Sequence, residues 1–433
     1  MTRSSIGVGL LGLGVVGGGV ARVLSEKSRT LQELAGCSIS LRRALVRDLA
    51  KDRSFELPSR LLTDAVADIL DDPEVDIVVE VMGGHDPAFD CILKAVSLGK
   101  HVVTANKEVM AQHGPDILTM ARKKGVQVLF EASVAGGTPI IAPLLRDLVA
   151  NEIVGLRAII NGTTNYILTR MAQEGVDFAD ALAEAQELGY AEADPTNDVE
   201  GVDAAYKLAI LSTLGFRARV KDTDVFREGI TRLTARDFQY ARELGYTIKL
   251  LAIAEKKGGA VQARVHPALV PSEVMIAKVD GVLNAIEVDT DLAGRVLFHG
   301  AGAGQMPTTS AVVADIVDIA RNLAGNVVPP SPISLDEALA IRPMQELETK
   351  YYLRLSVADR PGVFAQIATA LGDLSISIAS VIQKEADEAA QRAEIVLMTH
   401  RAKEAAIQEA LRVLDGLDVV SEVGNLVRVE EWG

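Results

Sequence analysis

A glycine-rich stretch near the N-terminus, residues 6–21 (IGVGLLGLGVVGGGVA), limits what this chain can fold into more than any other feature. Residues 6–11 form an apolar run typical of a buried parallel strand, and residues 15–24 can begin a helix. GLGVVG at 12–17 lies between them and fits the spacing G-x-G-x-x-G. A strand, a glycine turn and a helix in this order predict a dinucleotide-binding domain.

Each glycine of this turn has its own physical role. Gly12 permits a tight turn, Gly14 lets the backbone approach a pyrophosphate, and Gly17 lets the helix pack on the strand. The helix N-terminus offers unpaired N–H groups to the phosphates. The candidate cofactor-binding residues of the turn are Gly12, Leu13, Gly14, Val15, Val16 and Gly17.

Two other interpretations of the stretch stay open. Arg3 followed by an apolar segment also resembles a secretory signal, and a glycine-rich turn can serve packing alone. The seven glycines between positions 7 and 19 argue against a signal, because each weakens the helix that its apolar core adopts. We therefore expect the stretch to be retained in the folded protein.

The alternation of strands and helices continues after this stretch. It predicts a parallel sheet with right-handed crossovers, so residues 1–130 are expected to form a Rossmann-type domain of the α/β class. A helix at about 310–325 is expected to return to it. The further strands of this domain are expected at residues 38–46, 75–81, 101–105 and 125–130.

The end of the second expected strand bears on the choice of coenzyme. At this place an acidic residue binds the ribose 2′-OH of NAD, whereas an arginine suits the 2′-phosphate of NADP. Here Arg47 precedes Asp48. The pair favours NADP, with NAD possible, and a solvated charged loop is the alternative.

Asp203 and Lys207 are the strongest candidates for substrate-binding and catalytic residues. They are four residues apart on an expected helix that is apolar on most sides. An ordinary surface ion pair is the alternative, but burying a lysine is costly unless it is paired or has a function. Carboxylates such as Glu192 and Asp203 suit the ammonium group of an amino acid, and a lysine with a tuned pKa can act as general acid or base.

Lys107 is the second candidate. It follows the expected strand at 101–105 and begins a helix, where the helix dipole disfavours a cation. Ligands of parallel sheets bind at the carboxyl ends of the strands. An anion or a reacting oxygen near Lys107 therefore explains it better than a solvated surface lysine.

Beyond residue 131 the pattern changes to a second domain, expected at 131–309. It contains an expected strand at 154–161, a helix from residue 166, a polar loop at 193–201 and a glycine-rich loop at 298–308. Prolines then predict a linker at 326–348. Residues 349–433 show the order βαββαβ of a ferredoxin-like domain.

Composition excludes several classes of function. The formal net charge of −15 disfavours binding to nucleic-acid backbones. No HExxH or CxxC pattern indicates a zinc site, and no other apolar run is long enough to span a membrane. The two cysteines, Cys37 and Cys91, fit a reducing, cytoplasmic compartment.

Six long motifs, in order along the chain, resemble homoserine dehydrogenases: GLGVVG, HVVTANKE, EASVAGGTPI, NGTTNYIL, GYAEADPTNDVEGVDAAYKL and FHGAGAGQMPT. LRLSVADRPGVFAQIATAL resembles an ACT domain, a small amino-acid-sensing module. Together the resemblances cover nearly the whole chain. They imply an α+β substrate-binding and dimerisation domain after the Rossmann domain, and a C-terminal regulatory ACT domain. No kinase-like segment precedes the glycine turn, which implies the monofunctional form.

The resemblance also implies an activity and roles for residues. The activity is the reversible NAD(P)H-dependent reduction of L-aspartate 4-semialdehyde to L-homoserine, in threonine and methionine biosynthesis. Lys207 would give a proton to the aldehyde oxygen, and Lys107 would lie between nicotinamide and substrate and share that role. The coenzyme site would add Arg47, Thr104, Lys107 and Gly304. The substrate site would comprise Glu192, Asp203, Asp198 and Tyr190.

Three further implications concern ions, assembly and regulation. A monovalent cation, typically sodium, would be bound by Glu131, Val134, Gly136 and Thr138, mainly through backbone carbonyls. The chain would form a homodimer or homotetramer. L-threonine would be the feedback inhibitor, bound by the ACT loop at Asp359, Gly362 and Val363.

Two alternative functions remain at this stage. An aspartate-semialdehyde dehydrogenase on the same fold would need a thiol nucleophile in a site loop, and neither Cys37 nor Cys91 is placed in one. A non-enzymatic amino-acid sensor would keep the nucleotide domain only as a scaffold. The presence of both lysines and the acidic residues argues against it.

Overall fold

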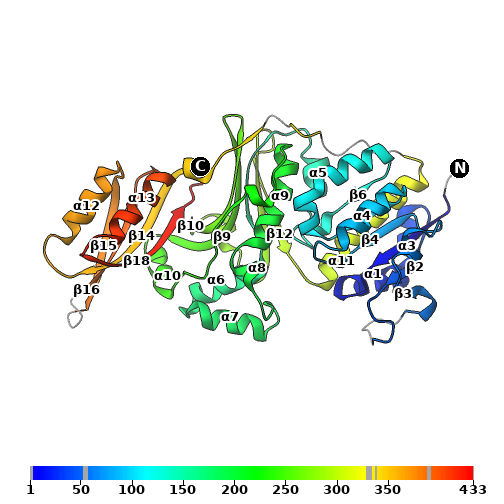
Figure 1. Ribbon diagram of the computed structural model, residues 1–433, viewed down its shortest axis with the longest axis horizontal. Helices are drawn as coiled ribbons and strands as arrows, with labels where there is room; N and C mark the ends of the chain where they lie inside the picture. Colours follow the sequence, from blue (N-terminus) through cyan, green and yellow to red (C-terminus); the bar gives the residue numbers. More distant parts are fainter. Residues whose placement is uncertain (1–2, 52–56, 328–333, 337–338, 388–391, 433) are drawn as a thin grey trace. The chain divides into compact units, whose positions relative to one another are not determined.

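The computed structural model describes residues 3–51, 57–327, 334–336, 339–387 and 392–432 (Figure 1). The chain divides into two compact units, each built from separate segments. The first comprises Met1–Leu156, Tyr206–Asp224 and Asn284–Leu339. The second comprises Arg157–Ala205, Val225–Leu283 and Ala340–Gly433.

A parallel sheet forms the centre of the first unit. Its strands lie in the order β3-β2-β1-β4-β5-β6, which is the order of a dinucleotide-binding Rossmann domain. The strands are β1 (Ser5–Leu11), β2 (Ser38–Leu45), β3 (Leu62–Thr63), β4 (Ile77–Glu80), β5 (His101–Thr104) and β6 (Val128–Leu129). The accompanying helices are α1 (Val15–Glu26), α2 (Ser28–Ala35), α3 (Ala67–Leu70), α4 (Ala88–Ser97) and α5 (Lys107–Lys124).

A sixth helix of this unit, α11 (Gln305–Ala324), comes from far along the chain. Its buried side chains Val312 and Ile316 belong to the same apolar core as Val8, Leu10 and Val79 of the sheet. β1 and β4 are apolar on both faces because helices cover both sides, as parallel sheets require. The prediction of a Rossmann-type α/β domain is confirmed.

Two local predictions in this unit were wrong. The strand expected at 125–130 is only Val128–Leu129, because Gly125, at φ +68°, still ends helix α5 in the left-handed conformation. The loop expected at 298–308 is strand β12 (Arg295–Ala301) followed by the first turn of α11. Gly304, at φ +116°, makes the tight turn between them.

The second unit combines a long hairpin with helices and an ACT domain. The hairpin pairs β9 (Tyr246–Lys257) with β10 (Ala260–Pro271) along their whole length. The helices are α6 (Gly162–Glu174), α7 (Phe178–Glu187), α8 (Thr196–Val199) and α10 (Ala235–Glu243). Three elements, β7 (Ile153–Ile159), α9 (Val202–Phe216) and β11 (Leu283–Thr290), begin in one unit and end in the other.

The ACT domain has the expected order βαββαβ. Its four long strands lie in the order β18-β14-β16-β15 and pair in antiparallel fashion. Strand β18 also pairs in parallel with β10, at Ala268 with Arg428, so the ACT sheet continues into the hairpin sheet of the same unit. Its elements are β14 (Glu348–Ala358), α12 (Val363–Asp373), β15 (Ile378–Asp387), β16 (Arg392–Thr399), α13 (Glu404–Asp415) and β18 (Val420–Val429).

Short elements connect these parts. Strand β8 (Phe226–Arg227) and strand β13 (Ala340–Ile341) both pair with β10, and β17 (Ala402–Lys403) pairs with β14. The linker expected at 326–348 lies partly outside the described residues, at 328–333 and 337–338. Among the helices that are described, none has the length and apolar character needed to cross a bilayer.

Candidate active site

The glycine turn between β1 and α1 has the geometry that a dinucleotide phosphate needs. Gly12 has φ +101°, a conformation that a side chain would strain. Gly14 is the N-cap of α1, and a Cβ on it would meet no heavy atom within 4 Å, so the backbone is open to a ligand. A Cβ on Gly17 would lie 2.1 Å from the Gly12 carbonyl oxygen. Leu13 and Val16 pack against the core, whereas Val15 is exposed.

A buried polar group supports the carboxyl ends of β4 and β5. Thr104 ends β5 and donates from Oγ1 to Glu80 Oε2 at 2.6 Å, and both residues are fully buried. Glu80 Oε1 accepts the Met82 N–H at 2.8 Å. Burial raises the pKa of Glu80, against the lowering effect of its hydrogen bonds. The group therefore holds the loop after β4 at the edge where nucleotides bind.

Asn106 places Lys107 at this same edge. Its Oδ1 caps helix α5 by accepting the Val109 N–H at 3.1 Å, and its Nδ2 donates to the Gly84 carbonyl at 2.7 Å. Lys107 is the first residue of α5 and is half-buried. Lys107 therefore lies at the carboxyl end of β5, the edge of a parallel sheet where ligands bind.

Two further residues expected at the coenzyme site, Arg47 and Gly304, lie next to the ends of other elements. Arg47 is exposed in the loop after β2. Gly304 is the N-cap of α11, whose Gln305 side chain donates to the Val15 carbonyl at 2.8 Å. The chain thus holds the N-terminal turn of α11 beside that of α1.

The turn at residues 131–138 is buried and tightly held. Glu131 is 6% exposed, and its carboxylate accepts the N–H groups of Ile140, Ile141 and Ala142 at 2.6, 2.9 and 2.7 Å. The Glu131 side chain therefore caps the N-terminus of the helical turn that follows. Thr138 is also buried.

This turn has features that suit a cation bound by oxygen atoms. Ala135 and Gly136 both have positive φ, which reorients successive carbonyl groups. A Cβ on Gly136 would lie 2.7 Å from the Gly302 carbonyl oxygen, and the Asn284 side chain lies against Gly302. Asn284 Oδ1 is a buried oxygen with no hydrogen-bond partner in the described part of the chain. Among the described residues, no three or more Asp, Glu, His or Cys side chains are grouped so that they could hold a metal ion.

Asn161 joins two acidic residues of the second unit. Its Nδ2 donates to Asp198 Oδ1 at 2.7 Å and to Asp203 Oδ2 at 2.9 Å. Its Oδ1 accepts the Thr164 N–H at 2.8 Å and so caps helix α6. The helix expected from residue 166 therefore begins at Gly162, because the cap draws NGTT into its first turn.

Residues 190–203, which we call the acidic loop, carry the expected substrate-binding side chains. Asp203 is 3% exposed and Asp198 is half-buried. Glu192 is exposed, and no hydrogen bond joins its carboxylate to Asn161 in the described part of the chain. The exposed ring of Tyr190 lies 5.0 Å from that of Tyr166. The structure thus brings Asp198 and Asp203 together and leaves Glu192 and Tyr190 open to a ligand.

Lys207 lies one turn beyond Asp203 on helix α9. It is half-buried, on a helix whose neighbours Ala204, Ala205 and Leu208 are buried. Residues four apart share a helix face. Asp203 and Lys207 therefore lie on the same side of α9.

Both thiols are unsuited to nucleophilic catalysis. Cys37 and Cys91 are buried, and burial raises the pKa of each thiol. A thiolate nucleophile needs the opposite shift. The alternative of a cysteine-dependent aldehyde dehydrogenase loses its support.

The expected regulatory residues lie in the loop after β14 and at the start of α12. Asp359 is exposed, Gly362 has φ +88° and is the N-cap of α12, and Val363 is buried. Exposed Phe364 follows them.

Sequence reasoning missed three residues that organise the site. Glu80 could have been found, because a carboxylate inside the apolar run VDIVVEV is costly unless it is bonded. Asn106 and Asn161 each precede a helix, which is the place of an N-cap. Their second bonds, to Gly84 and to the acidic pair, depend on tertiary contacts that no local pattern reveals.

Comparison with known proteins decides the family. Family models match residues 12–131 (homoserine dehydrogenase, NAD-binding domain), 139–317 (homoserine dehydrogenase) and 351–418 (ACT domain). A homoserine dehydrogenase of Neisseria gonorrhoeae is 43% identical over 431 residues, 98% of each chain. The chain belongs to the homoserine dehydrogenase family. It is an oxidoreductase that acts on a CH–OH group.

Solved structures agree with this membership. The crystal structure of a homoserine dehydrogenase from Thiobacillus denitrificans matches with a TM-score of 0.93 and 45% identity, covering all of both chains. A hyperthermophilic archaeal homoserine dehydrogenase in complex with NADPH matches with a TM-score of 0.62 and 27% identity. It covers 73% of this chain and 97% of its own.

The predictions of family, fold class and enzyme class are therefore confirmed. A nicotinamide coenzyme is supported by the NAD-binding domain and by the archaeal NADPH complex. The roles of individual residues stay predictions.

Proposed function

We propose that this homoserine dehydrogenase interconverts L-homoserine and L-aspartate 4-semialdehyde with NADP, and less readily with NAD, in the cytoplasm, in the biosynthesis of threonine and methionine. One observation carries the proposal: Asn161 joins Asp198 to Asp203, and Asp203 lies one helical turn before Lys207 on α9. Carboxylates for an ammonium group and a lysine for an alcohol oxygen are what this substrate requires.

The coenzyme would lie on the glycine turn, and when bound it supplies or accepts the hydride. Gly12, Gly14 and Gly17 leave room for the pyrophosphate at the N-terminus of α1. Thr104, Lys107 and Gly304 would contribute at the adjoining strand and helix ends. Arg47 would pair with the 2′-phosphate of NADP, and the proposed preference for NADP rests on this pairing.

The substrate's ammonium group would be held by the acidic loop. Glu192 is exposed and able to turn toward a ligand, with the Tyr190 ring beside it. Asp198 and Asp203 provide two further carboxylates, already oriented by the shared Asn161 donor. Orientation before binding reduces the entropy that the substrate complex would otherwise lose.

Lys207 would move the proton. In the direction of reduction, the Lys207 ammonium would give a proton to the aldehyde oxygen, so that a neutral alcohol would result. In the reverse direction neutral Lys207 would take the hydroxyl proton of homoserine. Lys107, fixed by the Asn106 cap, would stabilise charge on the same oxygen or share the transfer.

A monovalent cation, sodium by preference, would be held by the turn at 131–138, through Glu131, Val134, Gly136 and Thr138. The unpartnered buried Asn284 Oδ1 near this turn fits an oxygen-coordinated ion. Such an ion would stiffen the connection between β6 and the following helical turn.

The ACT domain would make the enzyme sensitive to L-threonine. Asp359, Gly362 and Val363 would contact the amino acid at the N-terminus of α12. We propose a homodimer or homotetramer, since amino-acid ligands of ACT modules often lie at interfaces between copies.

One assay tests the proposal. Purified full-length protein is mixed with L-homoserine and either NADP or NAD, and absorbance of the reduced coenzyme is followed, with and without sodium and L-threonine. Homoserine-dependent reduction, faster with NADP and slower with threonine, is the expected result. Folded protein that binds threonine and coenzyme but reduces neither coenzyme would favour a sensor over an enzyme.

A further inference from the structure

A short segment of the second unit connects its ACT domain to the acidic loop. We call residues 228–234, between β8 and α10, the strap. Its Ile230 N–H donates to the Val199 carbonyl at 2.9 Å, and Thr231 Oγ1 donates to Glu200 Oε1 at 3.2 Å. Val199 and Glu200 lie between Asp198 and Asp203 in the chain. The strap therefore packs against the part of the acidic loop that separates the two carboxylates.

At Gly229 the strap lies in close contact with the acidic loop. A Cβ on Gly229 would lie 2.5 Å from the Val199 carbonyl oxygen and 2.7 Å from Glu200 Oε2. Because the Val199 backbone lies this close to Gly229 and bonds to Ile230, we expect a shift of the strap to displace Val199. Such tightly packed segments pass displacement on instead of absorbing it.

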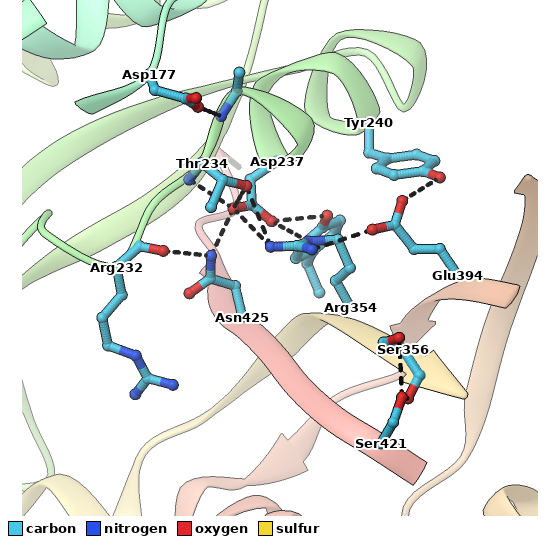
Figure 2. A network of polar contacts seen from close by, with 12 residues as sticks. Asp177, Arg232, Thr234, Asp237, Tyr240, Arg354, Ser356, Glu394, Ser421 and Asn425 are labelled. Atoms are coloured by element: carbon cyan, nitrogen blue, oxygen red, sulfur yellow. Dashed lines mark hydrogen bonds and ion pairs between the residues drawn. The ribbon is translucent and has the colours of Figure 1, made fainter. Parts of the chain in front are cut away.

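The ACT domain binds the strap through three polar side chains. Arg428 of β18 donates from Nη1 to Glu228 Oε2 at 2.7 Å. Asn425 of the same strand donates to the Arg232 carbonyl at 2.8 Å (Figure 2). Arg354 of β14 donates to Thr234 Oγ1 at 3.2 Å.

Buried charges make this attachment rigid. Asp237 follows the strap, is fully buried, and accepts from Arg354 Nε at 2.8 Å and from Asn425 Nδ2 at 2.5 Å (Figure 2). Arg428 is 1% exposed and also donates to Glu404 at 2.6 and 2.9 Å. Breaking a buried pair is costly, because it leaves an uncompensated charge. The strap thus follows strands β14 and β18 of the ACT domain.

We propose that Glu228 is a positioning residue for the substrate: Arg428 holds it, and the strap in turn fixes the acidic loop that presents Asp198 and Asp203. The ACT domain is then a brace for substrate binding even without an effector, and an effector that displaces β14 or β18 acts on homoserine affinity through the strap. The inference rests on the proposed function, because it assigns homoserine to the acidic loop.

The chain offers a matched pair of variants to test it. Glu228 and Glu255 have carboxylates that are 35% and 31% exposed, and each pairs with an almost fully buried arginine. Glu228→Gln weakens the hold on the strap, while Glu255→Gln, on strand β9, removes a carboxylate from Arg264, which keeps its pair with Glu430. A third variant, Thr231→Val, keeps the hold of the ACT domain but removes the bond to Glu200.

Two measurements on the full-length variants decide the matter. In steady-state assays, Glu228→Gln and Thr231→Val are expected to raise the KM for L-homoserine by about two- to tenfold while the KM for NADP stays unchanged. In hydrogen exchange followed by mass spectrometry, both are expected to speed exchange across residues 196–203. Glu255→Gln is expected to alter neither.

Equal behaviour of Glu228→Gln and Glu255→Gln in both measurements would overturn the inference. A rise in the KM for NADP as large as that for homoserine would also overturn it, because general destabilisation of the protein would weaken both sites. If the wild-type protein does not oxidise homoserine, the proposed function fails by itself. The exchange comparison still decides whether the strap holds the acidic loop.

Discussion

Gly17 lies so close to Gly12 that a Cβ on it would sit 2.1 Å from the Gly12 carbonyl oxygen. We therefore expect Gly17→Ala to push helix α1 away from the turn, to destabilise the protein by about 1–3 kcal/mol and to weaken NADP binding. Thermal unfolding and a fluorescence titration with NADPH measure the two effects.

Gly18→Ala is the matched control on the same helix. A Cβ there meets no heavy atom within 4 Å, so the variant should bind NADPH normally. It should gain up to about 1 kcal/mol, because alanine loses less conformational entropy than glycine in a helix. Unchanged NADPH affinity in Gly17→Ala would show that this turn does not hold the coenzyme.

Lys207→Met tests the proposed proton transfer. The variant keeps the length and apolar packing of the side chain on α9 but cannot exchange a proton. We expect kcat to fall by about 10²- to 10⁴-fold, the range for loss of a general acid or base. The dissociation constant for NADPH, measured by titration, should change less than about twofold, because Lys207 is not proposed to bind the coenzyme. Substantial turnover by Lys207→Met would move the proton role to Lys107.

The acidic pair is best probed through the residue that joins it. Asn161→Ser keeps an oxygen that can cap helix α6 but removes the amide donor shared by Asp198 and Asp203. A hydrogen bond to a charged group is worth about 1.5–3 kcal/mol. We expect the KM for L-homoserine to rise about tenfold or more, and the thermal midpoint to fall, because the buried Asp203 carboxylate loses a donor. Asn161→Ala, which also loses the cap, should lower the midpoint further.

The Rossmann sheet and the ACT order could be predicted because their signals are local. The run at 6–11 and the glycine turn recur in the structure as β1 and the start of α1, from Ser5 and Val15. Element ends were less accurate where a single side chain decided them. Asn161 moved the start of α6 from the expected residue 166 to Gly162, and Gly125 shortened the strand after α5.

The candidate site was predicted only in part. Asp203 and Lys207 carry charge on a mostly apolar helix, and Lys107 begins a helix where a cation is disfavoured; both features are visible in sequence. The strap cannot be recognised in the sequence, because its bonds join residues that are far apart along the chain, such as Glu228 and Arg428. The hairpin β9–β10 is among the elements between them. The pairing of β18 with β10 that creates this contact is a tertiary event without a local pattern.

His101 should make the stability of the first unit depend on pH. Burial, followed by the charge of Arg3, lowers its pKa from 6.5 to about 4. Its Nδ1 accepts the Gln127 N–H at 3.1 Å, which only the neutral ring can do. Between these two pKa values the unfolded chain binds a proton that the folded chain does not. The free energy of unfolding therefore falls by about 1.4 kcal/mol per unit as the pH drops from 6.5 to about 4.

His101→Asn isolates this effect, because an asparagine Oδ1 can accept the Gln127 N–H but does not titrate. Urea unfolding of both proteins, followed by a probe in the first unit, should show the wild type losing stability faster than the variant as the solution is acidified through this window. Other titrating groups, such as the buried His266, act equally in both proteins and cancel in the difference. Two parallel stability curves would mean that His101 accepts a proton as readily in the folded chain as in the unfolded one, and that the Gln127 bond does not oppose it.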